Sequence, residues 1–229
     1  MPVIVLTNIS RSYKNGLVTI EALKGINLSI DEGDFVSIMG PSGSGKSTML
    51  NIIGCLDKPT SGTYQIANKR VEKMGDSKLA DIRNQLIGFV FQSFHLLPDL
   101  NALENVELPL IYRGLSGHER RKRSIEALKS VGLNNRIHHR PSELSGGEQQ
   151  RVAIARAIVG NPKVLLADEP TGALDSKTSQ SIMEIFQDLN KNRGITIVQV
   201  THEKSIAQYG NRIFHLLDGE IEKVETVSH

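Results

Sequence analysis

The sequence has few of the features that mark secreted, membrane-spanning or nucleic-acid-binding proteins. Its 229 residues include one cysteine, Cys55, so no internal disulfide can form and a reducing compartment is favoured. No apolar run approaches the ~18–20 residues of a membrane span, and the N-terminus lacks the charged-then-apolar layout of a signal peptide. Lys and Arg outnumber Asp and Glu by only two, 27 against 25, which argues against a nucleic-acid partner. We therefore expect a cytoplasmic chain that reaches a membrane only through a partner.

The distribution of apolar residues predicts an α/β fold. Near-continuous apolar runs predict buried parallel strands at residues 35–39, 86–91, 164–167 and 195–200, and a weaker one at 212–217. Short strands are expected at residues 3–6, 20–23 and 26–30, separated by turns at Asn15-Gly16 and Lys24-Gly25. A helix is expected over residues 176–192, ended by Gly194.

The middle of the chain has a different character, because helical signals dominate between Asn101 and Gly160. Ser116 and Glu119 have the spacing of a capping box, and Gly132 is expected to end the helix that they begin. The basic residues 120–123 on this helix are interpreted as a solvated face. We expect a mostly parallel sheet domain (residues 1–92 and 161–229) with an antiparallel β-subdomain at its N-terminus and an inserted helical subdomain (residues 93–160).

One nine-residue segment carries the strongest chemical signal. It lies between the run at residues 35–39 and the apolar residues 49–53, and it matches the phosphate-binding pattern G-x-x-x-x-G-K-[ST] in a strand–loop–helix setting. Its glycines allow backbone N–H groups to face phosphate oxygens, Lys46 supplies a cation, and the Ser47 hydroxyl can bind Mg²⁺. The bland alternative is a Gly/Ser-rich turn that binds nothing. The nucleotide-binding residues are predicted to be Gly40, Pro41, Ser42, Gly43, Ser44, Gly45, Lys46, Ser47 and Thr48.

Two adjacent carboxylates follow the buried run at residues 164–167. Asp168 at a strand end beside the phosphate loop can hold Mg²⁺, directly or through water. Glu169 can then orient and deprotonate the attacking water. Two neighbouring acids could also form a surface turn, but four apolar residues before them favour the site.

A second anion-binding helix end is predicted at Ser145. Its side chain can cap a helix, and Gly146 and Gly147 expose the first N–H groups of that helix. Taken alone, this pattern is more often a cap than a site. With the phosphate loop in the same chain, it indicates either two phosphates or two subunits that share one nucleotide.

Taken together, these motifs resemble the nucleotide-binding subunit of an ATP-binding cassette (ABC) transporter, in the family's order over nearly the whole chain. The resemblance implies a RecA-like P-loop NTPase fold, an Mg²⁺-dependent ATPase and a head-to-tail dimer. It implies that residues 40–48 are the Walker A loop and that Ser145, Gly146 and Gly147 bind ATP held by the second copy, next to Asp175 of the D-loop. The remaining roles that it implies are adenine stacking for Tyr13, Mg²⁺ binding for Ser47, Gln92 and Asp168, and catalysis for Lys46, Gln92, Glu169 and His202.

One residue departs from the commonest form of the signature motif, which has glutamine where this chain has Glu148. A carboxylate in the first turn suits the helix dipole but not a neighbouring triphosphate. We infer that Glu148 points away from the phosphates.

A narrower resemblance, to the MacB/LolD subgroup, rests on the segments at residues 91–98, 104–109 and 167–176. It implies a membrane permease of the FtsX/MacB-like kind, docked near residues 92–100, at the cytoplasmic face of the cell membrane. Its cargo would be a lipoprotein, a peptide or a drug. Three alternatives stay open: a cell-division type that signals without transport, a soluble cassette of the DNA-repair type, and a degenerate cassette that binds ATP only as a regulator.

Overall fold

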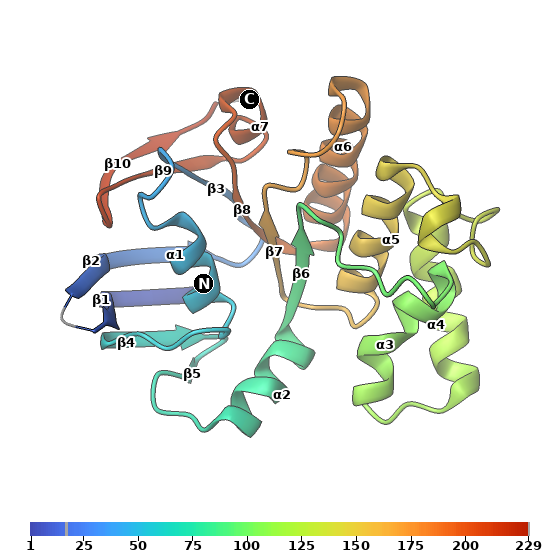
Figure 1. Cartoon of the computed structure of the whole chain (residues 1–229), viewed down its shortest axis with the longest axis horizontal. Helices are drawn as coiled ribbons and strands as arrows, with labels where there is room; N and C mark the ends of the chain where they lie inside the picture. Colours follow the sequence, from blue (N-terminus) through green and yellow to red (C-terminus); the bar gives the residue numbers. More distant parts are fainter. Residues whose placement is uncertain (17, 229) are drawn as a thin grey trace.

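The computed structural model describes residues 1–16 and 18–228, which form two sheets and several helices (Figure 1). The larger sheet has six strands in the order β10-β9-β3-β8-β7-β6. All neighbouring pairs are parallel except β9 and β10, so the predicted mostly parallel core is confirmed. Its strands are β3 (Phe35–Met39), β6 (Ile87–Phe91), β7 (Val164–Asp168), β8 (Thr196–Val200), β9 (Arg212–Leu217) and β10 (Glu220–Thr226).

The smaller sheet is antiparallel and is formed by strands from the first 70 residues. Its order is β2-β1-β4-β5, with β1 (Pro2–Asn15), β2 (Val18–Asp31), β4 (Ser61–Ile66) and β5 (Lys69–Arg70). The antiparallel N-terminal group was predicted, but the turn at Lys24-Gly25 is wrong. Between the pairs Ile9↔Ile26 and Arg11↔Leu23, two residues of β2 face one residue of β1. This β-bulge, with Gly25 at φ 60°, keeps β2 as one continuous strand.

Four helices pack against strands of the two sheets: α1 (Lys46–Ile53), α2 (Asp76–Leu86), α6 (Ser176–Arg193) and α7 (Lys204–Ala207). The helix expected over residues 176–192 is α6, and Gly194 ends it in the left-handed conformation, with φ 66°. Its apolar stripe belongs to the core, because Ile182 and Phe186 are fully buried and the ring of Phe186 lies 6.5 Å from that of Phe35. Helices α2 and α7 and strands β4, β5 and β10 were not anticipated.

Residues 101–160 form helices α3 (Ala102–Tyr112), α4 (Gly117–Ser130), the 3-10 turn η1 (Pro141–Glu143) and α5 (Gly146–Ile158), with no strand in this fully described stretch. Helix α3 begins with a capping box between Asn101 and Glu104, a signal that the sequence reading missed. The capping box predicted at Ser116 is only half formed. Its hydroxyl accepts from the Glu119 N–H, but the Glu119 carboxylate pairs with Arg123 instead, at 2.6 Å.

Candidate functional site

The loop between β3 and α1 has the geometry of a phosphate cradle. Gly43 and Gly45 lie at φ 81° and 102°, which side chains rarely adopt. A Cβ on Gly45 would lie 2.5 Å from the Ala22 carbonyl oxygen, whereas one on Gly43 would meet nothing within 4 Å. The loop backbone is therefore closely packed against β2 at Gly45 and has open space beside it at Gly43. The Ser44 hydroxyl is buried and has no hydrogen-bond partner among the described residues.

This loop forms one wall of a cavity of about 820 Å³. Lys46 lies inside the loop, where its Nζ donates to the carbonyl oxygens of Gly40 (2.9 Å) and Pro41 (2.7 Å). The cavity combines eight of the nine predicted loop residues with side chains from distant segments. Its lining is Ile20, Glu21, Ala22, Lys24, Gly40, Pro41, Ser42, Gly43, Gly45, Lys46, Ser47, Thr48, Glu169, His202, Asp218 and Gly219.

The strand register explains why residues far apart in sequence meet at this cavity. Phe91 pairs with Asp168, and Asp168 pairs with Val200, so the carboxyl ends of β6, β7 and β8 are level. Gln92, Glu169 and Thr201 therefore leave the sheet at the same edge. Ligand sites of open α/β sheets lie at this edge.

The predicted catalytic side chains come together here. His202 Nδ1 lies 3.0 Å from Glu169 Oε1, in a pair that is partly open to solvent. A Cβ built on Gly172 would lie 2.8 Å from Gln92 Nε2 and 3.4 Å from Glu169 Oε2, so both side chains close on the same glycine. Glu169 holds φ 46°, and its N–H donates to the Val200 carbonyl. A left-handed conformation in a non-glycine residue is a strain found most often at functional sites.

Asp168 lies behind this group as the last residue of β7. Burial raises the pKa of its carboxyl group, the Glu169 carboxylate raises it further, and the Lys46 ammonium group opposes both. No cluster of three or more His, Cys, Asp or Glu side chains able to hold a metal exists in residues 1–16 and 18–228. Asp168 and the Ser47 hydroxyl suit Mg²⁺ at a phosphate, because this ion binds one or two protein oxygens and takes the rest from phosphates and water.

Tyr13 lies outside the cavity lining, on the hairpin of β1 and β2. It pairs in register with Ile20, which does line the cavity. Its hydroxyl donates to Asp57 at 2.7 Å, and the Arg11 guanidinium lies over its ring at 4.5 Å from the centroid. One ring face is therefore covered, and the adenine-stacking role stays a prediction.

The second predicted anion site lies at the start of α5. Ser145 forms a full capping box with Glu148, whose Oε2 accepts from the Ser145 N–H at 2.8 Å. A Cβ on Gly147 would lie 2.4 Å from Thr178 Cγ2, so a side chain would fit there only if Thr178 moved. Asp175 caps α6 by accepting from the N–H groups of Lys177 and Thr178.

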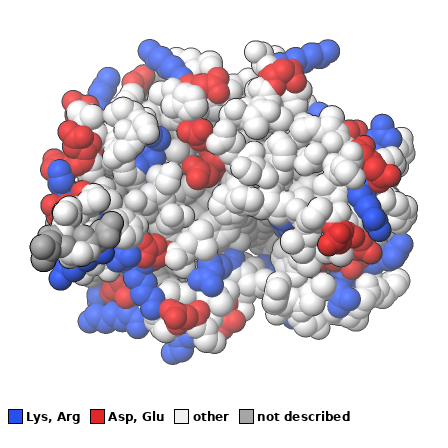
Figure 2. Space-filling model, in the orientation of Figure 1, with Lys and Arg blue, Asp and Glu red and all other residues white. Residues whose placement is uncertain are grey.

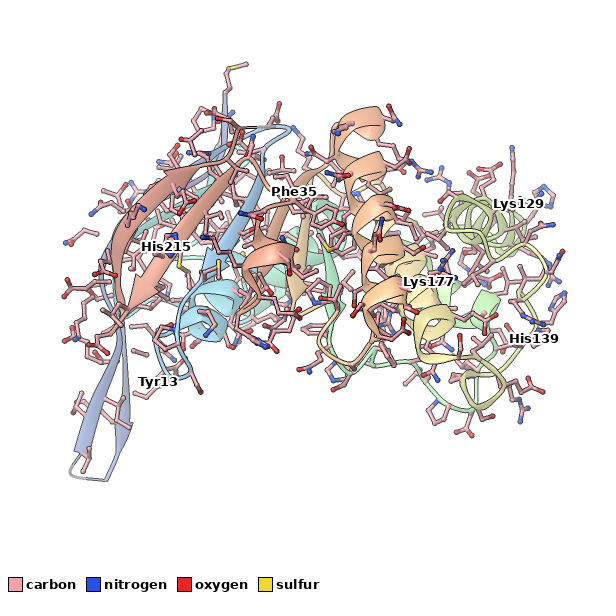
Figure 3. All side chains as sticks on the ribbon, turned by 90° about the horizontal axis from the view of Figure 1, so that it is seen from above. Tyr13, Phe35, Lys129, His139, Lys177 and His215 are labelled. Carbon is pink, nitrogen blue, oxygen red and sulfur yellow. The ribbon has the colours of Figure 1, made fainter. Side chains whose placement is uncertain are left out.

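These helix ends border a second cavity, of about 800 Å³. The cavity includes Ser145 and Gly147 but neither Gly146 nor Asp175. It also contains three cations that the sequence did not point to: Arg136 and Lys177 come from other segments, whereas Arg151 lies on α5 itself. Its lining is Gly132, Leu133, Asn134, Asn135, Arg136, Ser145, Gly147, Glu148, Arg151, Lys177, Thr178 and Ser181. In Figure 3, Lys177 lies in the opposite half of the molecule from Tyr13. In Figure 1, α1, which follows the phosphate loop, and α5, which follows Ser145, also lie in opposite halves, so the two anion-binding helix ends of one chain are separated.

Helix α5 also holds the segment that follows β6. The fully buried Gln150 amide donates to the carbonyl oxygens of Pro170 (2.5 Å) and Phe91 (3.4 Å). Arg156 donates to Phe94 (2.8 Å) and His95 (2.6 Å), and burial lowers the pKa of its guanidinium. Helix α5 is therefore hydrogen-bonded both to Pro170, which follows Glu169, and to the segment at residues 91–95.

Acidic and basic side chains are interspersed over the face shown in Figure 2. None of the helices within residues 1–16 and 18–228 combines the length and apolar character needed to cross a bilayer.

Comparison with known proteins gives a consistent result. Residues 23–172 match the family model described as ABC transporter. The chain is 59% identical over 226 residues to the uncharacterized ABC transporter ATP-binding protein MJ0796 of Methanocaldococcus jannaschii, covering 97% of this chain and 96% of that one. It is 50% identical over 216 residues to the macrolide export ATP-binding/permease protein MacB of Pectobacterium atrosepticum, covering 94% of this chain but only 33% of that longer protein.

Solved structures show the same likeness. A dimeric post-hydrolysis state of MJ0796 bound to ADP and Pi superposes with a TM-score of 0.91 at 55% identity, covering 99% of both chains. The structure of cbiO1 from Clostridium perfringens, part of the ABC transporter complex cbiONQ, superposes with a TM-score of 0.89 at 32% identity. It covers 98% of this chain and 88% of that one.

Proposed function

This chain belongs to the ABC transporter family as an ATP-binding and ATP-hydrolysing subunit, and from that premise we propose that two copies share each hydrolysis site and drive an FtsX/MacB-like permease. The observation that carries the proposal is the level ending of β6, β7 and β8. It brings Glu169 and His202 to the cavity formed by the phosphate loop, and it places Gln92 beside Glu169 just outside the cavity lining.

Each group at this edge has a definable task. Glu169 accepts the proton of the attacking water, and His202, which also lines the cavity, holds the Glu169 carboxylate in place at 3.0 Å. Lys46 and the loop N–H groups bind the β- and γ-phosphates. Ser47, Asp168 and Gln92 would hold Mg²⁺, which would neutralise charge on the phosphates.

The sharing of sites between copies follows from the separation of the two anion-binding helix ends. One ATP cannot touch both helix ends of the same chain, because α1 and α5 lie in opposite halves of the molecule (Figure 1). A head-to-tail pair brings Ser145 and Gly147 of one copy onto ATP held by the other, with Asp175 beside them. The dimeric structures of a relative 55–56% identical support the formation of a dimer.

The dimer model predicts that activity depends on protein concentration. At concentrations below the dimerisation midpoint, the ATPase rate per subunit should rise with protein concentration, because assembly precedes hydrolysis. Ser145→Arg should abolish this rise by filling the second cavity, while ATP binding to the monomer stays intact. Ultracentrifugation with ATP and a steady-state rate series measure both effects.

Ser116→Arg is the matched control, since Ser116 also caps a helix but lies outside both cavities. It should behave as the parent does. A rate per subunit that stays constant far below the midpoint would contradict shared sites.

We place the permease contact at residues 92–100, where the core passes into the helices. We also propose that residues 93–160 are the helical subdomain and that residues 1–92 and 161–229 are the core with its β-subdomain. Leu97 is 48% exposed in this segment, and the buried Asn105 fixes it by bonding its N–H (2.8 Å) and its carbonyl (3.1 Å). An apolar side chain on a rigidly held loop is suited to docking. The chain would then lie at the cytoplasmic face of the membrane.

Polar substitution in this loop should uncouple the complex. Leu97→Asn should leave the isolated subunit folded with its basal ATPase, but reduce permease binding or stimulation roughly tenfold, the effect expected when an apolar anchor is lost from an interface. Phe94 is a second probe, although its ring lies near Gly146, so its replacement also perturbs α5.

The control is Leu56→Asn, because Leu56 is 50% exposed outside the docking segment. Cysteine crosslinks from residue 97 to the co-purified permease locate the contact. Crosslinks found only elsewhere would refute the assignment.

A further inference from the structure

A carboxylate lies where the proposed function requires a triphosphate to arrive, contrary to the expectation that Glu148 points away from the phosphates. Glu148 is the acidic residue among those that line the second cavity, and Ser145 and Gly147 line it too. It cannot turn aside freely, since its Oε2 accepts the Ser145 N–H at 2.8 Å and the Ser145 Oγ accepts the Glu148 N–H at 3.3 Å. The capping box that shapes the helix end therefore also fixes a negative charge beside it.

Arg136 meets this charge from a different segment. Its Nε donates to Glu148 Oε1 at 3.0 Å, from the loop between α4 and η1. The loop is held by Gly132 at φ 79° and by the Arg136 N–H, which donates to Leu133 at 3.0 Å. The Ser145 N–H lowers the pKa of Glu148 most and Arg136 lowers it further, so the carboxylate stays ionised near neutral pH.

Folding stability does not account for the pair, because exposed ion pairs contribute little. The side chains are 48% and 28% exposed. An unpaired carboxylate would, however, repel an incoming polyanion over several ångströms, and this repulsion weakens as salt rises. Two further cations, Arg151 and Lys177, also line the cavity. The Arg151 guanidinium donates to Val131 and Ser181, whereas that of Arg136 is paired with Glu148.

We propose that Arg136 is a positioning residue that neutralises Glu148, so that the second cavity accepts ATP held by another copy of this chain. The inference rests on the proposed sharing of sites between copies. It accounts for the acidic residue in a position where the commonest signature has glutamine. Arg136 compensates the charge, and the capping function of Glu148 is retained.

The test is a double-mutant cycle in the Glu169→Gln background, in which the ATP-bound dimer accumulates. The ATP concentration at half-maximal dimerisation is measured by ultracentrifugation at low and high salt. Arg136→Ala should raise it about three- to tenfold at low salt and less at high salt. Glu148→Gln should stay within about twofold of the parent, since glutamine removes the charge that needs compensation. The double variant should return to the parent value.

Three controls keep the outcomes separate. Arg136→Lys should restore much of the affinity, because it retains the charge. Arg140→Ala removes an exposed cation outside both cavities and should change nothing. ATP affinity of the monomer, measured with a fluorescent analogue, should be equal in all variants.

Two results would overturn the inference while leaving the proposed function intact: a normal midpoint in Arg136→Ala, or a double variant no better than Arg136→Ala alone. The second result would mean that Arg136 acts only through the shape of its loop. Failure of the parent to dimerise with ATP would instead refute shared sites, and this inference with them.

Discussion

Glu169→Gln should slow ATP hydrolysis by about 10²–10⁴-fold, the usual contribution of general base catalysis, while ATP still binds. The carboxylate at this position lies 3.0 Å from His202 and lines the cavity of the phosphate loop. An amide of the same shape keeps the contacts but cannot accept a proton. Single-turnover phosphate release measures the loss of hydrolysis rate. The ATP-bound dimer should accumulate, because hydrolysis no longer leads to its dissociation.

The matched control is Glu203→Gln, which makes the same chemical change one residue after His202 but outside the cavity lining. It should hydrolyse ATP at the parent rate. If Glu169→Gln also did so, Glu169 would not be the base, and the water would have to be activated by another group at this edge.

Lys46→Ala should abolish nucleotide binding or weaken it by about 10²-fold or more, because truncating one partner of a desolvated charge pair is among the costliest changes at a binding site. Lys46 Nζ is held by the Gly40 and Pro41 carbonyls, so the cation is positioned by the loop that cradles the phosphates. Equilibrium titration with a fluorescent ATP analogue tests this.

Lys73→Ala serves as the control, since Lys73 is exposed on a segment remote from both cavities. Thermal unfolding should be similar in both variants, which separates lost binding from lost folding. Unchanged affinity in Lys46→Ala would mean that residues 40–48 are not the nucleotide site.

Local signals in the sequence predicted much of the fold. The buried parallel strands and helix α6 were found within one residue at each end, because continuous apolar runs and a capped apolar stripe are properties of adjacent residues. The errors arose where one local sequence pattern is compatible with two different structures. Lys24-Gly25 is compatible with a turn or a bulge, and pairing with β1 decides for the bulge. Helix α3 contains Pro109, which hid its apolar pattern.

The candidate site was likewise predictable from the sequence only in part. The phosphate loop could be identified from nine consecutive residues, because its function depends on backbone conformations that glycines allow. The likeness of the whole chain to ABC cassettes was also evident from the order of its motifs. The meeting of Gln92, Glu169 and His202 could be expected only by resemblance, since it depends on which strands are neighbours.

The sequence by itself determined the parallel core strands, helix α6, the phosphate loop, the paired acids at the end of β7 and the capped glycines at α5. These are set by residues within a few positions of each other, whose backbone preferences act locally. Only the tertiary structure decided that Gln150 and Arg156 tie α5 to residues 91–95, that α1 and α5 lie in different halves of the molecule, and that Arg136 reaches Glu148. Such contacts depend on strand order, helix packing and loop path, which arise from burial of the whole core rather than from any short segment.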